Sequence, residues 1–142
     1  TKNNLLPPPV KKKYSKEHVL LLIFIYYFKN ILSIKDIETV LKPLKEKYFS
    51  GEEEVELSDL YEEVCSMEKS RIGTLQEAVK AAYDRAAETF TGITDEESRD
   101  ELQLFAFICN LSFDVYLKKT MIEKIIDGLA EKKSGEETDK TK

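Results

Sequence analysis

The residues from Val19 to Phe28 form an unbroken run of aliphatic and aromatic side chains. Ser15, just ahead of the run, is a good N-cap residue, and Glu17 would face the positive end of a helix dipole. The pattern therefore predicts a helix over residues 16–30. Because this helix is apolar on every side, the rest of the chain is expected to enclose it.

A second helix is expected to begin after Ser33. Ser33 and Asp36 have the spacing of a capping box in which Asp replaces the usual Glu. Apolar residues follow at helical spacing, namely Ile34, Ile37, Val40, Leu41 and Leu44. Pro43 either ends or kinks this helix. A glycine followed by an acidic run then closes a first segment, which we place at residues 1–49.

Residues 50–130 are predicted to form an acidic helical bundle. A first amphipathic helix, capped at Ser58, carries the apolar residues Leu57, Leu60, Tyr61, Val64, Met67 and Ile72. Gly73 is expected to break this helix, because Thr74 and Glu77 have the spacing of a capping box that would start the next one.

Gly92 is expected to cap that next helix at its C-terminus, and Thr94 and Glu97 to open the longest helical pattern. This pattern runs from Asp95 to about Leu129. Its length is typical of a coiled-coil-like segment, or of two helices that meet near residues 118–120. Residues 131–142 have no aliphatic or aromatic side chain and are predicted to be disordered.

The net charge of −5 is distributed unevenly. Up to Phe49 the chain carries ten lysines and four acidic residues, whereas the remainder carries 12 basic and 23 acidic residues. An acidic protein would not suit nucleic acid, but the basic N-terminal third makes nucleic-acid binding possible there. The alternative is an ordinary solvated surface on which lysines happen to cluster.

No pattern of catalytic or metal-binding residues is present. His18 is the only histidine, the acidic runs lack the spacing of a calcium loop, and no glycine-rich phosphate loop occurs. Cys65 and Cys109 are far apart and are expected to be reduced thiols. We therefore expect a protein that is not an enzyme and that uses no cofactor and no metal.

No apolar run approaches the length of about 18 residues that a membrane-spanning helix requires. Lys11–Lys13 followed by an apolar run superficially resembles a signal sequence, but no small-residue cleavage site follows. We expect a cytoplasmic protein that does not bind membranes. The chain begins at Thr1 rather than at Met, so residues are expected upstream.

Several features of the first third occur together in a fixed order. Leu5–Pro9 is followed by Tyr14 and the capping Ser15, then by the aliphatic spacing of Val19, Leu22 and Ile25, and finally by the serine-capped helix at Ser33. This order resembles the second half of a MerR-type winged helix-turn-helix domain. With its acidic body, including Asp114–Lys119 and Ile122–Ile126, the chain is similar to the bacterial domain-of-unknown-function family 1836, whose members are treated as MerR-like transcriptional regulators.

The chain departs from the MerR pattern at three points. Only Val10–Lys13 lies between Pro9 and Tyr14, where the family has a longer wing hairpin that usually bears arginine. Asn30–Leu32 stands where a glycine normally precedes the capping serine. The helix-turn-helix itself would lie before Thr1, so base readout is assigned to no residue of this chain.

The resemblance implies an all-α fold with a MerR-like winged-helix remnant followed by an α-helical bundle, and a homodimer that binds double-stranded DNA. The residues expected to contact the DNA backbone are Lys2, Lys11, Lys12, Lys13, Tyr14 and Lys16. The residues expected at the dimer interface are Leu104, Ile108, Leu111 and Val115. This second set would equally suit packing inside one subunit, because both uses need an apolar face.

The function we expect is DNA binding by a transcriptional regulator, whose acidic body dimerises or senses an effector that the sequence does not identify. The alternative is a helical protein-interaction module that does not bind DNA. The two differ in whether the N-terminal lysines contact phosphates.

Overall fold

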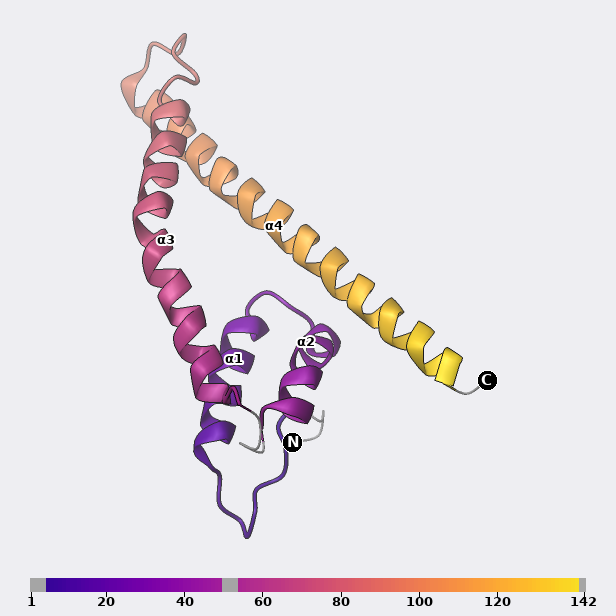
Figure 1. Cartoon of the computed structure of the whole chain (residues 1–142). Coiled ribbons are helices and arrows are strands. Elements are labelled where there is room, and N and C mark those ends of the chain that lie inside the picture. Colours follow the sequence, from indigo (N-terminus) through magenta and orange to yellow (C-terminus); the bar gives the residue numbers. More distant parts are fainter. Residues whose placement is uncertain (1–4, 50–53, 141–142) are drawn as a thin grey trace. The chain divides into compact units, whose positions relative to one another are not determined.

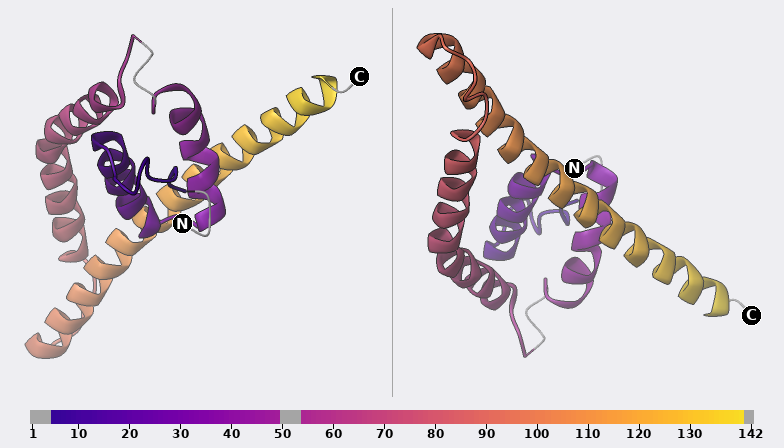
Figure 2. Two further views of the ribbon diagram at one scale, coloured as in Figure 1. Left: turned by 90° about the horizontal axis from the view of Figure 1, so that it is seen from below. Right: turned by 90° about the horizontal axis from the view of Figure 1, so that it is seen from above.

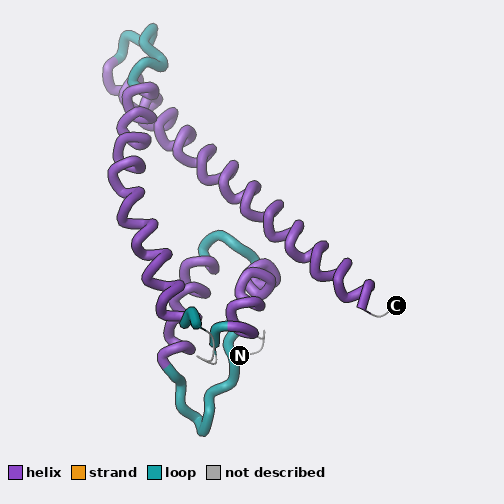
Figure 3. Tube along the Cα trace, in the orientation of Figure 1, coloured by secondary structure: helices purple, strands orange, loops and turns teal. Residues whose placement is uncertain are grey.

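The computed structural model describes residues 5–49 and 54–140, and these residues form four α-helices joined by loops (Figure 1, Figure 3). The helices are α1 (Lys16–Lys29), α2 (Ile34–Lys47), α3 (Leu57–Ala86) and α4 (Glu96–Lys140). Within the described residues, the β-type pairing is one isolated bridge between Val10 and Lys13. The predicted all-α fold is confirmed.

The chain divides into two compact units. The first unit comprises residues 1–65 together with 119–142, and the second comprises residues 66–118. The long helices α3 and α4 therefore each contribute to both units. The predicted division into residues 1–49, 50–130 and 131–142 differs from this one, because the end of α4 belongs with the N-terminal helices.

All four helices contribute to the hydrophobic core of the first unit. Its buried residues are Leu6, Leu20, Leu21, Leu32, Ile37, Leu41, Leu57 and Ile126. Helices α1 and α2 supply two of these residues each, the loops before each of these two helices supply Leu6 and Leu32, and α3 and α4 supply one each. Ile126 is 3% exposed, which shows that the C-terminal part of α4 completes this core.

Helix α1 agrees with the predicted helix to within one residue and begins after Ser15, as expected. It is not enclosed on every side, however. Leu20 and Leu21 are buried, whereas Val19 is 52% exposed, Leu22 46% and Tyr26 69%. The prediction of a fully enclosed helix was wrong for this chain taken alone. The other elements of the first unit pack against one face of α1 and leave the opposite face exposed.

Helix α2 begins at the predicted cap, where the Ser33 hydroxyl accepts a hydrogen bond from the Asp36 N–H at 3.1 Å. The helix then continues through Pro43 to Lys47. Proline forfeits one hydrogen bond, to the carbonyl of Thr39, but its fixed φ suits a helix. Ile37 and Leu41, both buried in the core, hold this segment in place.

The predicted break at Gly73 was wrong, because α3 is one helix from Leu57 to Ala86. A single glycine costs a helix only about 1 kcal/mol relative to alanine, and good helix formers flank this one. The predicted cap at Ser58 was also wrong. The helix begins at Leu57, and the Asp59 carboxylate accepts a hydrogen bond from the Glu56 N–H at 2.9 Å. Gly92 does not cap α3, which ends six residues earlier.

Helix α4 begins one residue later than the predicted capping box implies. Asp95, rather than Thr94, is the cap, because its carboxylate accepts from the Ser98 hydroxyl at 2.6 Å and from the Ser98 N–H at 3.0 Å. These two hydrogen bonds hold the pKa of Asp95 below its ordinary value, and the bond from the Ser98 hydroxyl has the larger effect.

The prediction that residues 131–142 are disordered was wrong over the described part, because α4 continues to Lys140. The alternative of two helices meeting near residues 118–120 was wrong for the same reason. Lysine and glutamate are good helix formers, and Lys132 and Glu136 have the spacing of a charge pair. Lys133, Ser134 and Glu137 of this segment line a cleft together with residues of α2, and Figure 2 shows the segment as a continuous part of α4. The absence of apolar residues therefore did not exclude order.

The second unit is a helical hairpin formed by residues 66–86 of α3 and 96–118 of α4. Ala82 and Ala86 are buried between the helices, and the rings of Tyr83 and Phe107 meet edge to face with centroids 5.5 Å apart. The Gln103 side chain donates to the carbonyls of Ala87 at 3.1 Å and Thr89 at 2.9 Å. These bonds fix the connecting loop to α4.

Replacing Gly73 with alanine tests whether α3 is continuous. A methyl group at this position meets no atom within 4 Å, so Gly73→Ala should raise the free energy of unfolding by about 0.5–1 kcal/mol. Urea unfolding followed by circular dichroism measures the change, and Ala81→Gly in the same helix should lower stability by a similar amount. A destabilised Gly73→Ala variant would contradict the unbroken helix.

Candidate nucleic-acid interface

The predicted lysine cluster lies on a tight turn between Pro9 and Tyr14. The Lys13 N–H donates to the Val10 carbonyl at 3.0 Å, and the two residues form the isolated antiparallel bridge. Lys11 and Lys12 occupy the two central positions, with φ values of 51° and 61°. Two positive φ values in succession are the mark of a type I′ turn, the usual connection of a two-residue hairpin. We call Val10–Lys13 the lysine turn.

Lysine is an unusual residue for these two positions. Asparagine and glycine dominate type I′ turns, because a left-handed backbone costs other L-residues about 1–2 kcal/mol each. Within this exposed turn the lysines make no contact that explains the cost. Backbone strain of this kind clusters at functional sites, so the choice of lysine over asparagine-glycine suggests a role for the charges.

His18 anchors the lysine turn to α1. Its imidazole is 1% exposed, and its Nδ1 accepts from the Ser15 N–H at 3.0 Å and from the Ser15 hydroxyl at 2.8 Å. Its Nε2 lies 3.0 Å from the carbonyl oxygen of Pro7 and 3.3 Å from that of Pro8. Because Nδ1 faces the N–H donor of Ser15 and Nε2 faces two carbonyl acceptors, the ring proton is assigned to Nε2. The ring therefore joins the proline segment to the N-terminus of α1.

Two aromatic rings pack edge to face against this imidazole. The Tyr14 ring centroid lies 5.1 Å from that of His18, and the Phe49 ring centroid lies 4.8 Å from it. Tyr14 itself remains 59% exposed, so one side of its ring is open to solvent. The histidine and its neighbours thus support both ends of the loop that carries the lysine turn.

The structure brings five of the six predicted DNA-contact residues together on one exposed segment. Lys11, Lys12, Lys13, Tyr14 and Lys16 are all exposed and lie within the lysine turn or at the start of α1. Lys2 lies outside the described residues. Sequence reasoning considered His18 as a possible metal ligand and missed its anchoring role. The signal was available: a histidine three residues after a capping serine stands at the capping-box position of glutamate.

The predicted dimer-interface residues lie on the α4 part of the second unit. Leu104 is 57% exposed, Ile108 53% and Val115 64%, whereas Leu111 is half-buried. Their spacing of four, three and four residues places them on one face of the helix. This apolar stripe is therefore largely exposed in the second unit.

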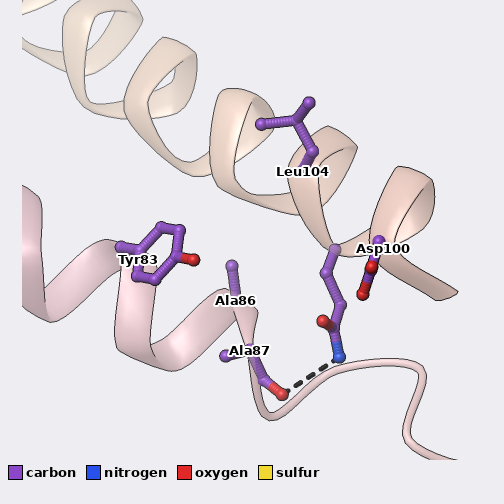
Figure 4. Close-up of a pocket in the computed structure, with 6 residues that line it drawn as sticks. Tyr83, Ala86, Ala87, Asp100 and Leu104 are labelled. Carbon is purple, nitrogen blue, oxygen red and sulfur yellow. Dashed lines mark hydrogen bonds between the residues drawn. The ribbon is translucent and has the colours of Figure 1, made fainter. Parts of the chain in front are cut away.

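A small cleft lies where the hairpin of the second unit closes (Figure 4). Its volume is about 330 Å³, and it is lined by Tyr83, Ala86, Ala87, Asp100, Gln103 and Leu104. The Gln103 amide is engaged by the loop carbonyls, so one of the few polar groups here is already used. The cleft brings no nucleophile and base together.

The described residues include no group of three or more histidine, cysteine, aspartate or glutamate side chains that could hold a metal ion. Cys65 is half-buried and Cys109 is exposed, and both are free thiols. Over the same part of the chain, no helix combines the length and the apolar character needed to cross a membrane.

Replacing His18 with leucine tests the anchor. His18→Leu should lower the free energy of unfolding by about 2–3 kcal/mol, because the Pro7 carbonyl and the Ser15 N–H lose their buried partner. Chemical denaturation measures the change. Tyr26→Leu on the exposed face of the same helix should stay within about 0.5 kcal/mol of the parent. Equal stabilities for the two variants would contradict the anchoring role.

Comparison with known proteins gives a match over the N-terminal part of the chain. Neither a curated protein nor a solved structure is similar to the chain at a significant level. Residues 1–64 match a protein family described as the domain of unknown function DUF1836. The matched segment contains the lysine turn, its histidine anchor, α1, α2 and the start of α3, which bears out the resemblance to that family over this part of the chain.

Proposed function

We propose that this chain is part of a DNA-binding transcriptional regulator of MerR-like, winged-helix type that acts in the cytoplasm. In this proposal the lysine turn is a minimal wing, which contacts the phosphate backbone of double-stranded DNA. The observation that carries the proposal is the strained, exposed pair of lysines at the tip of an anchored two-residue turn.

Geometry and charge both support phosphate contact. Lys11, Lys12, Lys13 and Lys16 lie close together in sequence on one exposed segment, so their ammonium groups can reach neighbouring phosphates. The segment up to Phe49 has an excess of six positive charges, whereas the remainder of the chain is acidic. Such contacts orient a protein on the duplex without reading its sequence. Base readout would come from other residues of the regulator.

Charge reversal in the lysine turn tests the DNA contact. Lys11→Glu, Lys12→Glu and Lys13→Glu together should abolish binding to a duplex of mixed sequence, measured by fluorescence anisotropy. A milder variant, Lys11→Asn with Lys12→Gly, preserves the turn type and should keep or raise stability. It should nevertheless weaken DNA binding and reduce the magnitude of the salt slope by about 2, because each lost phosphate contact removes about 0.9.

Two controls make this result specific to the turn. Reversing Lys118, Lys119 and Lys124, which are exposed on α4, changes the net charge by the same amount and should weaken binding less than reversal in the turn. The helix content of every variant should match that of the parent by circular dichroism. Unchanged affinity and salt slope for the asparagine-glycine variant would show that the turn is not the contact.

The homodimer that MerR-like regulators form is part of the proposal. The exposed stripe of Leu104, Ile108 and Val115, with the half-buried Leu111, is the surface that would be covered by a second copy. Apolar faces this continuous are rare on monomeric proteins, because their exposure to water is unfavourable. A two-fold dimer would bury the same stripe from both copies.

A charge at the centre of this stripe tests the dimer. Ile108→Glu should give a folded monomer, because the side chain is 53% exposed in the single chain and its replacement disturbs only the contact between copies. Sedimentation velocity measures the change in mass, and circular dichroism checks folding. Phe113→Glu, an exposed substitution on the opposite face of α4, should remain dimeric. A dimeric Ile108→Glu variant would place the interface elsewhere.

The alternative is a helical protein-interaction module without DNA binding. The observation in its favour is the open face of α1, on which Val19, Leu22 and Tyr26 are exposed. Such a face suits a partner helix. The two functions separate in the same anisotropy experiment, because an interaction module would show no salt-dependent affinity for DNA.

A further inference from the structure

A second group of lysines lies in the first unit, away from the lysine turn. Helix α2 and the last turns of α4 form a cleft of about 290 Å³. One wall is Lys35, Glu38, Thr39 and Lys42 of α2, and the other is Ala130, Lys133, Ser134 and Glu137 of α4. Each set follows the spacing of one helix face. We call this the α2–α4 cleft.

The charge of Lys133 is not compensated in this cleft. Its Nζ atom is buried, and no group of the described residues forms a hydrogen bond with it. Glu38 and Glu137 line the same cleft, yet neither carboxylate bonds to this nitrogen. Removing an ammonium group from water is costly unless an anion or several acceptors replace the water. The Lys133 ammonium group therefore needs a further hydrogen-bond acceptor in the cleft.

The lining specifies what kind of acceptor fits. Lys35, Lys42 and Lys133 outnumber the two glutamates, so the cleft carries an excess positive charge. The hydroxyl proton of Thr39 is donated to the Lys35 carbonyl at 3.0 Å, and the three ammonium groups are the charged donors of the cleft. The volume is at the lower end of the range for ligand pockets, about 300–1,000 Å³. It suits a compact oxyanion and is too small for a duplex.

We propose that the α2–α4 cleft binds a phosphate group, either inorganic phosphate or the phosphate of a small monoester. Lys133 makes the central contact from α4, and Lys35 and Lys42 contact the same group from α2. A phosphate dianion supplies the acceptors that the buried ammonium lacks and compensates the lysines of both helices. Occupancy of the cleft would fasten the end of α4 to α2, because a ligand that binds the packed state stabilises it.

The proposal does not depend on DNA binding. The lysine turn and the α2–α4 cleft share no residue, so each can be tested with the other intact. Free phosphate is a weak ligand for scattered surface lysines, and a saturable response confined to residues 35–42 and 130–137 distinguishes the cleft from such binding.

Nuclear magnetic resonance of the uniformly ¹⁵N-labelled whole chain provides the test. Sodium phosphate is titrated at constant ionic strength against sodium chloride, and adenosine monophosphate is titrated in parallel. We expect saturable shifts of the amides of residues 35–42 and 130–137, with a Kd of roughly 0.1–10 mM for phosphate. Tighter binding of the nucleotide would identify a monoester as the preferred source, and equal or weaker binding would identify inorganic phosphate.

Lys133→Met removes the charge and keeps most of the side-chain volume, so it should raise the Kd at least about tenfold. Lys124→Met, on an exposed position of the same helix, should leave the Kd unchanged, as should the asparagine-glycine variant of the lysine turn. If Lys133→Met perturbs the spectrum without phosphate, Lys42→Met on the opposite wall replaces it and should also weaken binding. Absence of saturable shifts in the parent, or a Kd unaffected by both substitutions, would overturn the proposal.

Discussion

The buried imidazole of His18 is the contact on which the N-terminal segment depends. It stands at the position of the glutamate in an ordinary capping box. Unlike glutamate, it also has an N–H donor, at Nε2. One ring therefore satisfies the start of α1 and the carbonyls of a proline segment that has few backbone donors of its own. The short loop between them is held at both ends, and its two central residues can remain in a left-handed backbone without any support from a sheet.

Local chemistry determined how well the elements were predicted from sequence. Ser15 and Ser33 were correctly identified as caps, because their side-chain hydrogen bonds involve residues only three positions away. Gly73 was misinterpreted, because its helix cost is small and the surrounding helix formers outweigh it. Residues 131–140 were misassigned because their lysines and glutamates are good helix formers, so a segment without apolar residues can still continue a helix.

The features of the candidate sites were likewise predicted where they depend on neighbouring residues and missed where they depend on the fold. The lysine turn was identified as a cluster of charges from sequence, but its turn type was not, because neither Lys11 nor Lys12 is a residue that usually adopts a positive φ. The α2–α4 cleft was not predicted, since its lysines lie on two different helices and Lys42 and Lys133 are more than eighty positions apart in the sequence. The apolar stripe on α4 was predicted correctly as a face, and its exposure in the single chain could be learned only from the fold.

The left-handed backbone of Lys11 and Lys12 has a consequence for the energetics of any contact they make. Ordering a flexible loop at the moment of association would subtract from affinity, because each residue fixed loses conformational entropy. In this chain that loss is incurred during folding, when the turn is closed and its base is joined to α1. The backbone thus arrives preorganised, while the long lysine side chains stay free to adjust to the spacing of the groups they meet.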